Sequence, residues 1–137
     1  MISLMFEVPE EPKAKARPRV TRSGIAFTPK NTVMYENLVR TSFQQSYPDH
    51  VPLNCEIQAI ITAYFSIPKS VSNKKRELMS FGLISPTKKP DLDNIAKAIL
   101  DSLNGIAYKD DSQIVSLLIS KKYSDRPRVE IALKEKV

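Results

Sequence analysis

The sequence predicts an α+β fold in a single domain, with a mostly antiparallel or mixed sheet, two main helices and a basic hairpin arm. The 137 residues are about the length of one ordinary domain. Apolar and polar residues alternate with the period of a strand near both ends of the chain, and helical periodicity lies between them. Strands first and last, with helices between, are typical of α+β architectures.

The N-terminal part predicts a strand, a hairpin and a helix. Residues 2–8 alternate as a half-buried strand does, and prolines follow. Two short extended stretches flank Arg22-Ser23-Gly24, which predicts a hairpin over about 17–28 with Gly24 in the turn. Thr28-Pro29 is typical of a helix N-cap and the first helical residue, and the apolar spacing after it predicts a helix over about 29–46.

The rest of the chain predicts three more strands and two more helices. The apolar residues of 53–65 fall on odd positions, which is the clearest strand pattern in the sequence. A helix beginning at about Asp93 has a firm apolar stripe and is closed by Gly105. The remaining expected elements are a weakly patterned helix over 72–80 and two strands around 115–119 and 129–133.

Composition limits the possible functions. A net charge of +6 favours a polyanion as the partner. A single cysteine and a single histidine exclude an internal disulfide and a Cys/His zinc site, and the three scattered glycines exclude a nucleotide-binding glycine-rich loop. The sequence has no apolar run long enough for a membrane span and no basic leader, so we expect a cytoplasmic protein without a membrane partner or a nucleotide cofactor.

A basic arm is the first candidate functional feature. Residues 12–30 hold six basic residues and no acidic one, and unpaired like charges this close together need a compensating partner. DNA phosphates would supply it, although the ordinary alternative is a solvated loop. The expected DNA contacts are Lys13, Lys15, Arg17, Arg19 and Arg22 of the arm, with Lys88 and Lys89 in the loop before the helix at Asp93.

A concentration of aspartates is the second feature, since five of the seven lie within 91–111. Asp91 and Asp93 converge if the helix starts at about Asp93, and the strand after Asp110-Asp111 would bring a third carboxylate if it pairs beside the Asp91 segment. Carboxylates without a nearby histidine or cysteine suit Mg²⁺ or Mn²⁺. Lys97 would lie one turn after Asp93 and stabilise negative charge, whereas Asp101 is expected to face outward and pair with Lys97.

Each aspartate also has an ordinary explanation. Asp-x-Asp-Asn before a helix is often a capping device, and Asp110-Asp111 is compatible with a solvated turn. Two further hypotheses therefore stay open. One is a non-enzymatic nucleic-acid-binding module whose aspartates only cap and turn, and the other is a small nucleotide phosphohydrolase, which would leave the basic arm without a role.

The motifs together resemble a known family. The first motif is the run Lys88-Lys89-Pro90-Asp91-Leu92-Asp93-Asn94, and it is followed by Lys97, Leu103-Asn104-Gly105 and Lys109-Asp110-Asp111-Ser112-Gln113-Ile114-Val115. In this order the motifs resemble the RusA crossover junction endodeoxyribonucleases, Holliday junction resolvases often carried by prophages. One departure is Pro90, which stands where some members have a basic residue.

The resemblance implies a Mg²⁺-dependent homodimer that nicks two opposed strands of a four-way DNA junction in recombination and repair. It also implies Asp91, Asp93 and Asp111 as metal carboxylates and Lys97 as the essential lysine, with Asp110 an uncertain neighbour. A four-way junction has a two-fold axis, and paired cuts related by that axis require two active sites. We therefore expect a homodimer.

Overall fold

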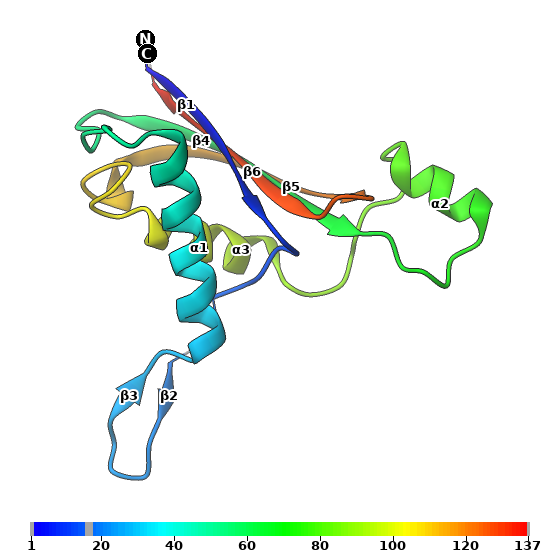
Figure 1. Cartoon of the computed structure of the whole chain (residues 1–137), viewed down its shortest axis with the longest axis horizontal. Helices are drawn as coiled ribbons and strands as arrows, with labels where there is room; N and C mark the ends of the chain where they lie inside the picture. The colour runs from blue at the N-terminus through cyan, green and yellow to red at the C-terminus, as the bar shows by residue number, and fades with distance from the viewer. Residues whose placement is uncertain (1, 16–17, 137) are drawn as a thin grey trace.

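The computed structural model describes residues 2–15 and 18–136, and its centre is a mixed four-stranded sheet (Figure 1). The sheet has the order β1-β6-β4-β5. Strands β4 and β5 are parallel, whereas β6 runs antiparallel to both of its neighbours. The predicted α+β class is confirmed. The strands are β1 (Ser3–Pro9), β4 (Ile57–Ser66), β5 (Ile114–Ser124) and β6 (Arg128–Glu135).

Two helices cover one face of this sheet, as Figure 1 shows: α1 (Lys30–Ser46) and α3 (Leu92–Ser102). The odd-numbered residues of β4 point to this face and are buried, because successive side chains of a strand alternate between its faces. Phe6 of β1 packs edge-on against Phe43 of α1, with ring centroids 5.2 Å apart. This apolar layer fixes the position of α3 against the sheet.

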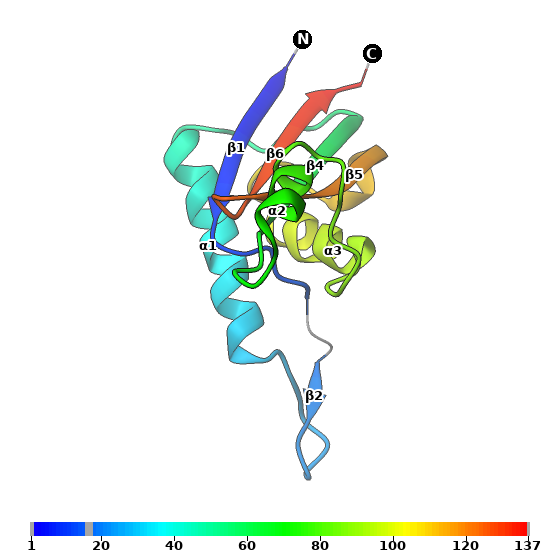
Figure 2. The ribbon, with the colours of Figure 1, turned by 90° about the vertical axis from the view of Figure 1, so that its right-hand side faces the viewer.

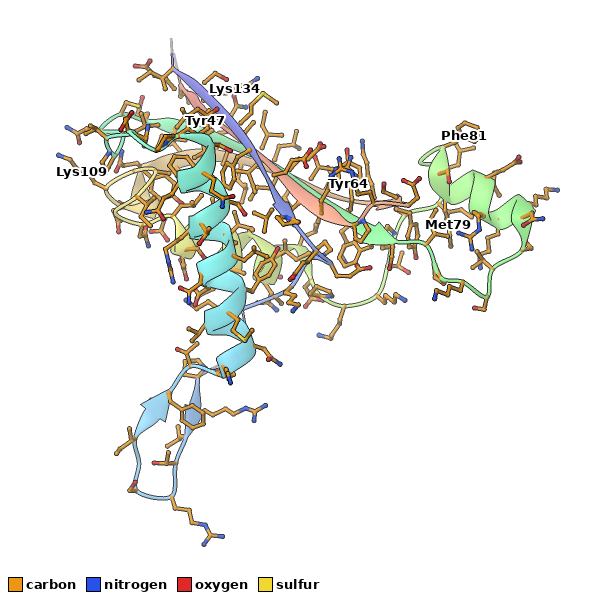
Figure 3. All side chains as sticks on the ribbon, in the orientation of Figure 1. Tyr47, Tyr64, Met79, Phe81, Lys109 and Lys134 are labelled. Carbon is orange, nitrogen blue, oxygen red and sulfur yellow. The ribbon has the colours of Figure 1, made fainter. Side chains whose placement is uncertain are left out.

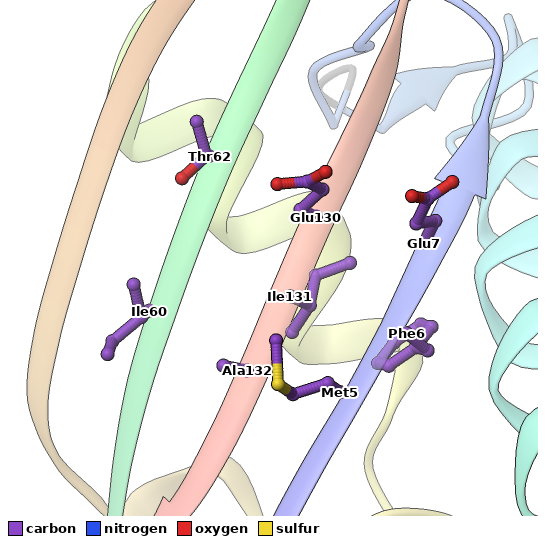
Figure 4. A pocket seen from close by; sticks show the side chains of 8 residues that line it. All are labelled: Met5, Phe6, Glu7, Ile60, Thr62, Glu130, Ile131 and Ala132. Atoms are coloured by element: carbon purple, nitrogen blue, oxygen red, sulfur yellow. The ribbon is translucent and has the colours of Figure 1, made fainter.

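The other face of the sheet is open and carries one apolar row. Met5, Ala132, Ile60 and Leu118 are successive cross-strand neighbours across all four strands. Met5 is 67% exposed and Leu118 is 59% exposed. A shallow depression of about 340 Å³ lies along this row and ends at the acidic side chains of Glu7 and Glu130 (Figure 4).

Two segments project from the body of the molecule. We call residues 12–30 the hairpin arm. Within it, strands β2 (Arg19–Val20) and β3 (Ala26–Phe27) form a hairpin. Gly24 adopts a φ of 83° in its turn, as predicted. Helix α2 (Asn73–Ser80) stands beyond the end of the sheet in Figure 1, and Figure 2 shows the hairpin well clear of it.

Local details differ from the sequence-based expectations. Pro29, rather than Thr28, occupies the N-cap position of α1, which has no side-chain cap. The strand expected at 53 begins at Ile57, because Leu53 instead forms an isolated bridge with Tyr108. Strand β5 follows a single 3₁₀ turn, η1 (Asp111–Gln113), and its ladder partner is β4. Its Lys121 also donates a hydrogen bond to the carbonyl of Lys88, just before Asp91.

In the part of the chain that the structure describes, no helix has the length and apolar character needed to cross a membrane.

Truncating the inner face of α3 should destabilise the fold. We expect Ile99→Ala to lower the free energy of unfolding by about 2–5 kcal/mol, because Ile99 is fully buried and its removal leaves a cavity. Val51→Ala, at a residue that is 78% exposed, is the control and should change it by less than about 0.5 kcal/mol. Urea unfolding followed by circular dichroism measures both, and equal losses would contradict this description of the core.

Candidate active site

One face of helix α3 is apolar and buried, and the opposite face is charged. Ile95, Ile99 and Leu103 are completely buried against the body of the protein. Residues four apart lie one above another on a helix, so Asp93, Lys97 and Asp101 occupy successive turns of the same outward side. The packing of the inner face therefore determines where these three charges are presented.

Asp91 and Asp93 lie at the N-terminal end of α3. Asp91 is the N-cap residue, with extended backbone at φ −72° and ψ 154°, but its side chain makes no capping hydrogen bond. Its carboxylate instead lies 3.6 Å from the ammonium of Lys89, and both side chains are well exposed. Capping therefore does not account for Asp91. The partial positive charge at the helix N-terminus favours carboxylates at both positions.

Asp111 lies near the other end of the helix, in contact with Asp101. The backbone N–H of Asp111 donates a 2.8 Å hydrogen bond to Oδ1 of Asn104, which holds the start of η1 beside the end of α3. A hydrogen bond shared with the Asp101 carboxylate, partial burial and the charges of Asp101 and Asp110 raise the pKa of Asp111. Two carboxyl groups in contact are unfavourable when both are ionised.

Lys15 compensates part of this negative charge. Its ammonium donates a 3.0 Å hydrogen bond to Oδ2 of Asp101 and lies 3.6 Å from Oε2 of Glu36. Burial alone would lower the pKa of Lys15, but these two carboxylates raise it. Burial also opposes ionisation of Asp101, yet hydrogen bonds from Lys15 and Asp111 and the charges of Lys15 and Lys97 hold its pKa below the usual value.

The neighbouring loop explains Asp110 as a structural residue. The side chain of Asp110 accepts a 3.0 Å hydrogen bond from the backbone N–H of Ser112. Gln113 completes a capping box and also donates to the carbonyls of Leu53 and Cys55, which anchors η1 to the chain before β4. The hydrogen bonds from Ser112 lower the pKa of Asp110. The ordinary explanation as a turn residue is therefore confirmed for Asp110.

The expected convergence of Asp91, Asp93 and Asp111 is not found within one chain. Over residues 2–15 and 18–136, no group of three or more histidine, cysteine, aspartate or glutamate side chains is placed to hold a metal ion. The physical reason is the helix itself. Asp111 meets Asp101, and the ten residues from Asp91 to Asp101 span about 15 Å of helix.

The ion pair expected between Asp101 and Lys97 is replaced by another. Asp101 pairs with Lys15, and Asp111 and the charge of Lys97 also act on its carboxylate. Helical spacing predicts that Asp101 lies on the outward side of the helix. It does not predict that Asp111, ten residues later in the chain, lies beside Asp101. Asn104, which positions Asp111, was visible only as part of a family-like motif and not from a physical signal.

The predicted DNA contacts divide into two groups. Lys15 is only 25% exposed at its side chain and already paired, which makes it less available to phosphate than its neighbours. Arg17 lies outside the described residues. The other predicted contacts are exposed: Lys13, Arg19, Arg22, Lys88 and Lys89.

The two members of the carboxyl pair should have opposite effects on stability. We expect Asp111→Asn to raise the free energy of unfolding at pH 7 by less than about 1 kcal/mol, because an amide donates to Asp101 without adding charge. Asp101→Asn should lower it, because Lys15 loses its closest partner.

The pH dependence follows from the raised pKa of Asp111. The folded state holds this proton to higher pH than the unfolded state, so ionisation of Asp111 costs stability as pH rises through that pKa. The gain from Asp111→Asn should therefore shrink as pH falls and Asp111 becomes protonated. Urea unfolding between about pH 3.5 and pH 7, from ordinary carboxyl pKa values to neutrality, measures this. A gain that grows towards acid would contradict the assignment.

Comparison with known proteins places the chain in a family. The family model described as "Endodeoxyribonuclease RusA" matches residues 9–134. The chain is also similar to a curated protein of Bacillus subtilis (strain 168), "Uncharacterized protein YqaN", with 39% identity over 140 residues that cover 98% of each chain. The matched region contains α1, α2, α3, η1, strands β2 to β5 and nearly all of β6, together with all the aspartates of α3 and η1. The chain belongs to the RusA family of endodeoxyribonucleases, which are nucleases that hydrolyse DNA.

Proposed function

We propose that this protein resolves four-way DNA junctions by paired nicks, using Mg²⁺, with Mn²⁺ as a substitute. The approach of Asp101 and Asp111 carries this proposal. Lys15 holds the carboxylate of Asp101, and Asn104 at the end of α3 holds the backbone of Asp111 beside it. A divalent cation would relieve their repulsion, and Mg²⁺ typically binds one or two carboxylates together with substrate phosphate oxygens. Family membership and the exposed basic residues support DNA as the substrate.

Within one chain, two carboxylates rather than three lie close enough together to bind one cation. Asp101 and Asp111 form the pair that we assign to the cation, and Asp101 is therefore added to the expected set. Asp91 and Asp93 remain proposed metal carboxylates because of the family resemblance, at the opposite end of the same side of α3. A bound cation would polarise the phosphodiester and lower the pKa of an attacking water.

Lys97 lies between the two ends of this charged side. It is exposed, and its charge contributes to the lowered pKa of Asp101. We propose that its ammonium stabilises the negative charge that develops on the phosphoryl oxygens during hydrolysis. Lys15 would keep Asp101 ionised and oriented, because it approaches Asp101 from the base of the hairpin arm.

Substitution of the proposed carboxylates tests this function. We expect Asp111→Asn and Asp93→Asn each to reduce cleavage of a synthetic four-way junction by at least about a hundredfold, because each removes charge stabilisation from the transition state. Junction affinity measured in EDTA should stay near the wild-type value. Asp49→Asn, at an exposed aspartate in the loop after α1, is the control. Cleavage by Asp111→Asn at the rate of this control would contradict the assignment.

The alternative of a non-enzymatic DNA-binding module has less support. It requires the aspartates to act as caps and turn residues, and only Asp110 does so in the described structure. Asp91 makes no side-chain cap, and Asp111 is held against another carboxyl group. Membership of a nuclease family also favours an enzyme.

We propose further that the active form is a homodimer, since two cuts related by a two-fold axis require two copies of the site. The apolar row of Met5, Ala132, Ile60 and Leu118 on the open face of the sheet is the candidate interface. A two-fold axis along this row would bring the rows of two copies together, with polar residues on either side. The open face lies opposite α1 and α3, so both copies would keep the charged side of α3 accessible (Figure 4).

Sedimentation equilibrium at micromolar concentration tests this dimer. The wild-type protein should sediment with twice the chain mass of 15.5 kDa, and Leu118→Lys should shift it towards 15.5 kDa by placing a charge in the apolar row. Val51→Lys is the matched control, because Val51 is 78% exposed in a different region. A wild-type species of 15.5 kDa alone would contradict the dimer, and an unchanged mass for Leu118→Lys would exclude this face as its interface.

A further inference from the structure

The excursion between β4 and α3 is a second basic segment. Residues 67–90, which we call the second arm, contain six basic residues and one acidic residue. Only two of the six, Lys88 and Lys89, were among the predicted DNA contacts. The other four are Lys69, Lys74, Lys75 and Arg76.

Charge is strongly divided between the two arms and the rest of the chain. Outside residues 12–30 and 67–90, the sequence has nine basic and fourteen acidic residues, a net charge of −5. A body with this charge repels a polyanion. The two arms must therefore provide the electrostatic attraction to DNA, since phosphate neutralisation supplies most of non-specific affinity.

The exposed side chains of the second arm suit a nucleic-acid surface. Lys69, Lys74 and Lys75 are exposed, whereas Arg76 is engaged in a 3.2 Å hydrogen bond to the carbonyl of Pro68. Phe81 is 77% exposed and projects outward at the end of α2 (Figure 3). Aromatic rings among basic side chains are typical of surfaces that contact bases and sugars.

The second arm is longer than a crossover between parallel strands requires. One crossover helix is enough, and the connection from β4 to β5 contains both α2 and α3, each of which contacts β5. Helix α2 buries only Met79 among its own residues. Ordering a long excursion costs conformational entropy, and long connections in compact domains usually carry a function.

Both arms join the first turn of α3. The backbone N–H of Lys15, at the base of the hairpin arm, donates a 3.3 Å hydrogen bond to the carbonyl of Asn94. The second arm runs directly into Asp91, and its exit is fixed by a 2.6 Å hydrogen bond from Lys121 to the carbonyl of Lys88. The two arms leave the body in different directions in Figure 1, so the start of α3 lies between their bases.

We propose that the second arm is a separate DNA contact, in which Lys69, Lys74 and Lys75 bind the phosphates of one duplex arm and Phe81 packs against its sugars and bases. The hairpin arm then binds a different duplex arm of the same junction. This inference rests on the proposed function and names the part of the substrate that α2 contacts.

Binding measurements on a fluorescent four-way junction in EDTA test the proposal. The double variant Lys74→Gln/Lys75→Gln should weaken binding severalfold at about 0.1 M salt. It should also reduce the slope of log K against log salt by about 1.8, because each lost phosphate contact removes about 0.9. The matched control is Lys134→Gln/Lys136→Gln, which removes the same charge from exposed lysines, with Lys134 near the opposite end of the sheet (Figure 3).

The outcomes separate this inference from the proposed function. Wild-type binding and Mg²⁺-dependent cleavage of the junction, together with equal salt slopes for the two double variants, would overturn the second arm as a DNA contact and leave the nuclease assignment intact. Absence of junction binding and cleavage by the wild-type protein would overturn both.

The aromatic part of the contact needs its own variant. Phe81→Ala should raise the dissociation constant severalfold without changing the salt slope, because an apolar contact releases no counterions. Val51→Ala, at a residue that is 78% exposed elsewhere, is the control and should leave the dissociation constant unchanged. Equal dissociation constants for these two variants would exclude Phe81 from the interface.

Discussion

Electrostatic repulsion between carboxylates and DNA phosphates is the constraint on which this molecule depends. A nuclease with acidic groups at its site must bring a polyanion to them. The chain meets this constraint by separating charge in space: a net-negative body holds the aspartates, and two basic arms extend from it. Both arms are attached to the first turn of α3, the helix that also carries most of these aspartates. The residues that attract DNA and the carboxylates that repel it are therefore both positioned by α3.

The packing of α3 turns this charge distribution into a defined geometry. Its buried face is held by the sheet and α1, so its opposite side has a fixed direction. The loop after α3 is equally well supported, since Tyr108 is fully buried and its hydroxyl donates to the carbonyl of Leu100. Asn104 then holds the backbone of Asp111. The resulting contact with Asp101 is unfavourable in isolation, as expected for a site whose charge is completed by a cation or a proton.

The sequence predicts the elements of this fold better than their arrangement. The alternation in β1, β4 and β6 and the apolar stripe of α3 identify those elements because burial of one face imposes a period on the residues themselves. The pairing of the strands does not follow from such a period. That β5 pairs with β4, and in parallel, depends on the path of a crossover connection, which local periodicity does not encode.

The same distinction applies to the site. Asp91, Asp93 and Lys97 were placed correctly on the start and outward side of α3, because those positions follow from helix geometry. The partner of Asp111 was not predictable in this way, since its contact with Asp101 depends on the turn at 103–110. The ion pairs of Lys15 were not predictable for a similar reason: its charge was counted with the arm, and only the fold shows that it pairs with Asp101 and Glu36.

The central claim is that a cation allows these carboxylates to act on DNA bound by the arms. The most direct measurement is a single-turnover reaction in which wild-type protein is bound to a four-way junction in EDTA and then mixed with excess Mg²⁺. The junction should be intact before mixing and should carry paired nicks afterwards, and a linear duplex of the same sequence should be cut far more slowly. Cleavage in EDTA, or equal cleavage of duplex and junction, would contradict the claim.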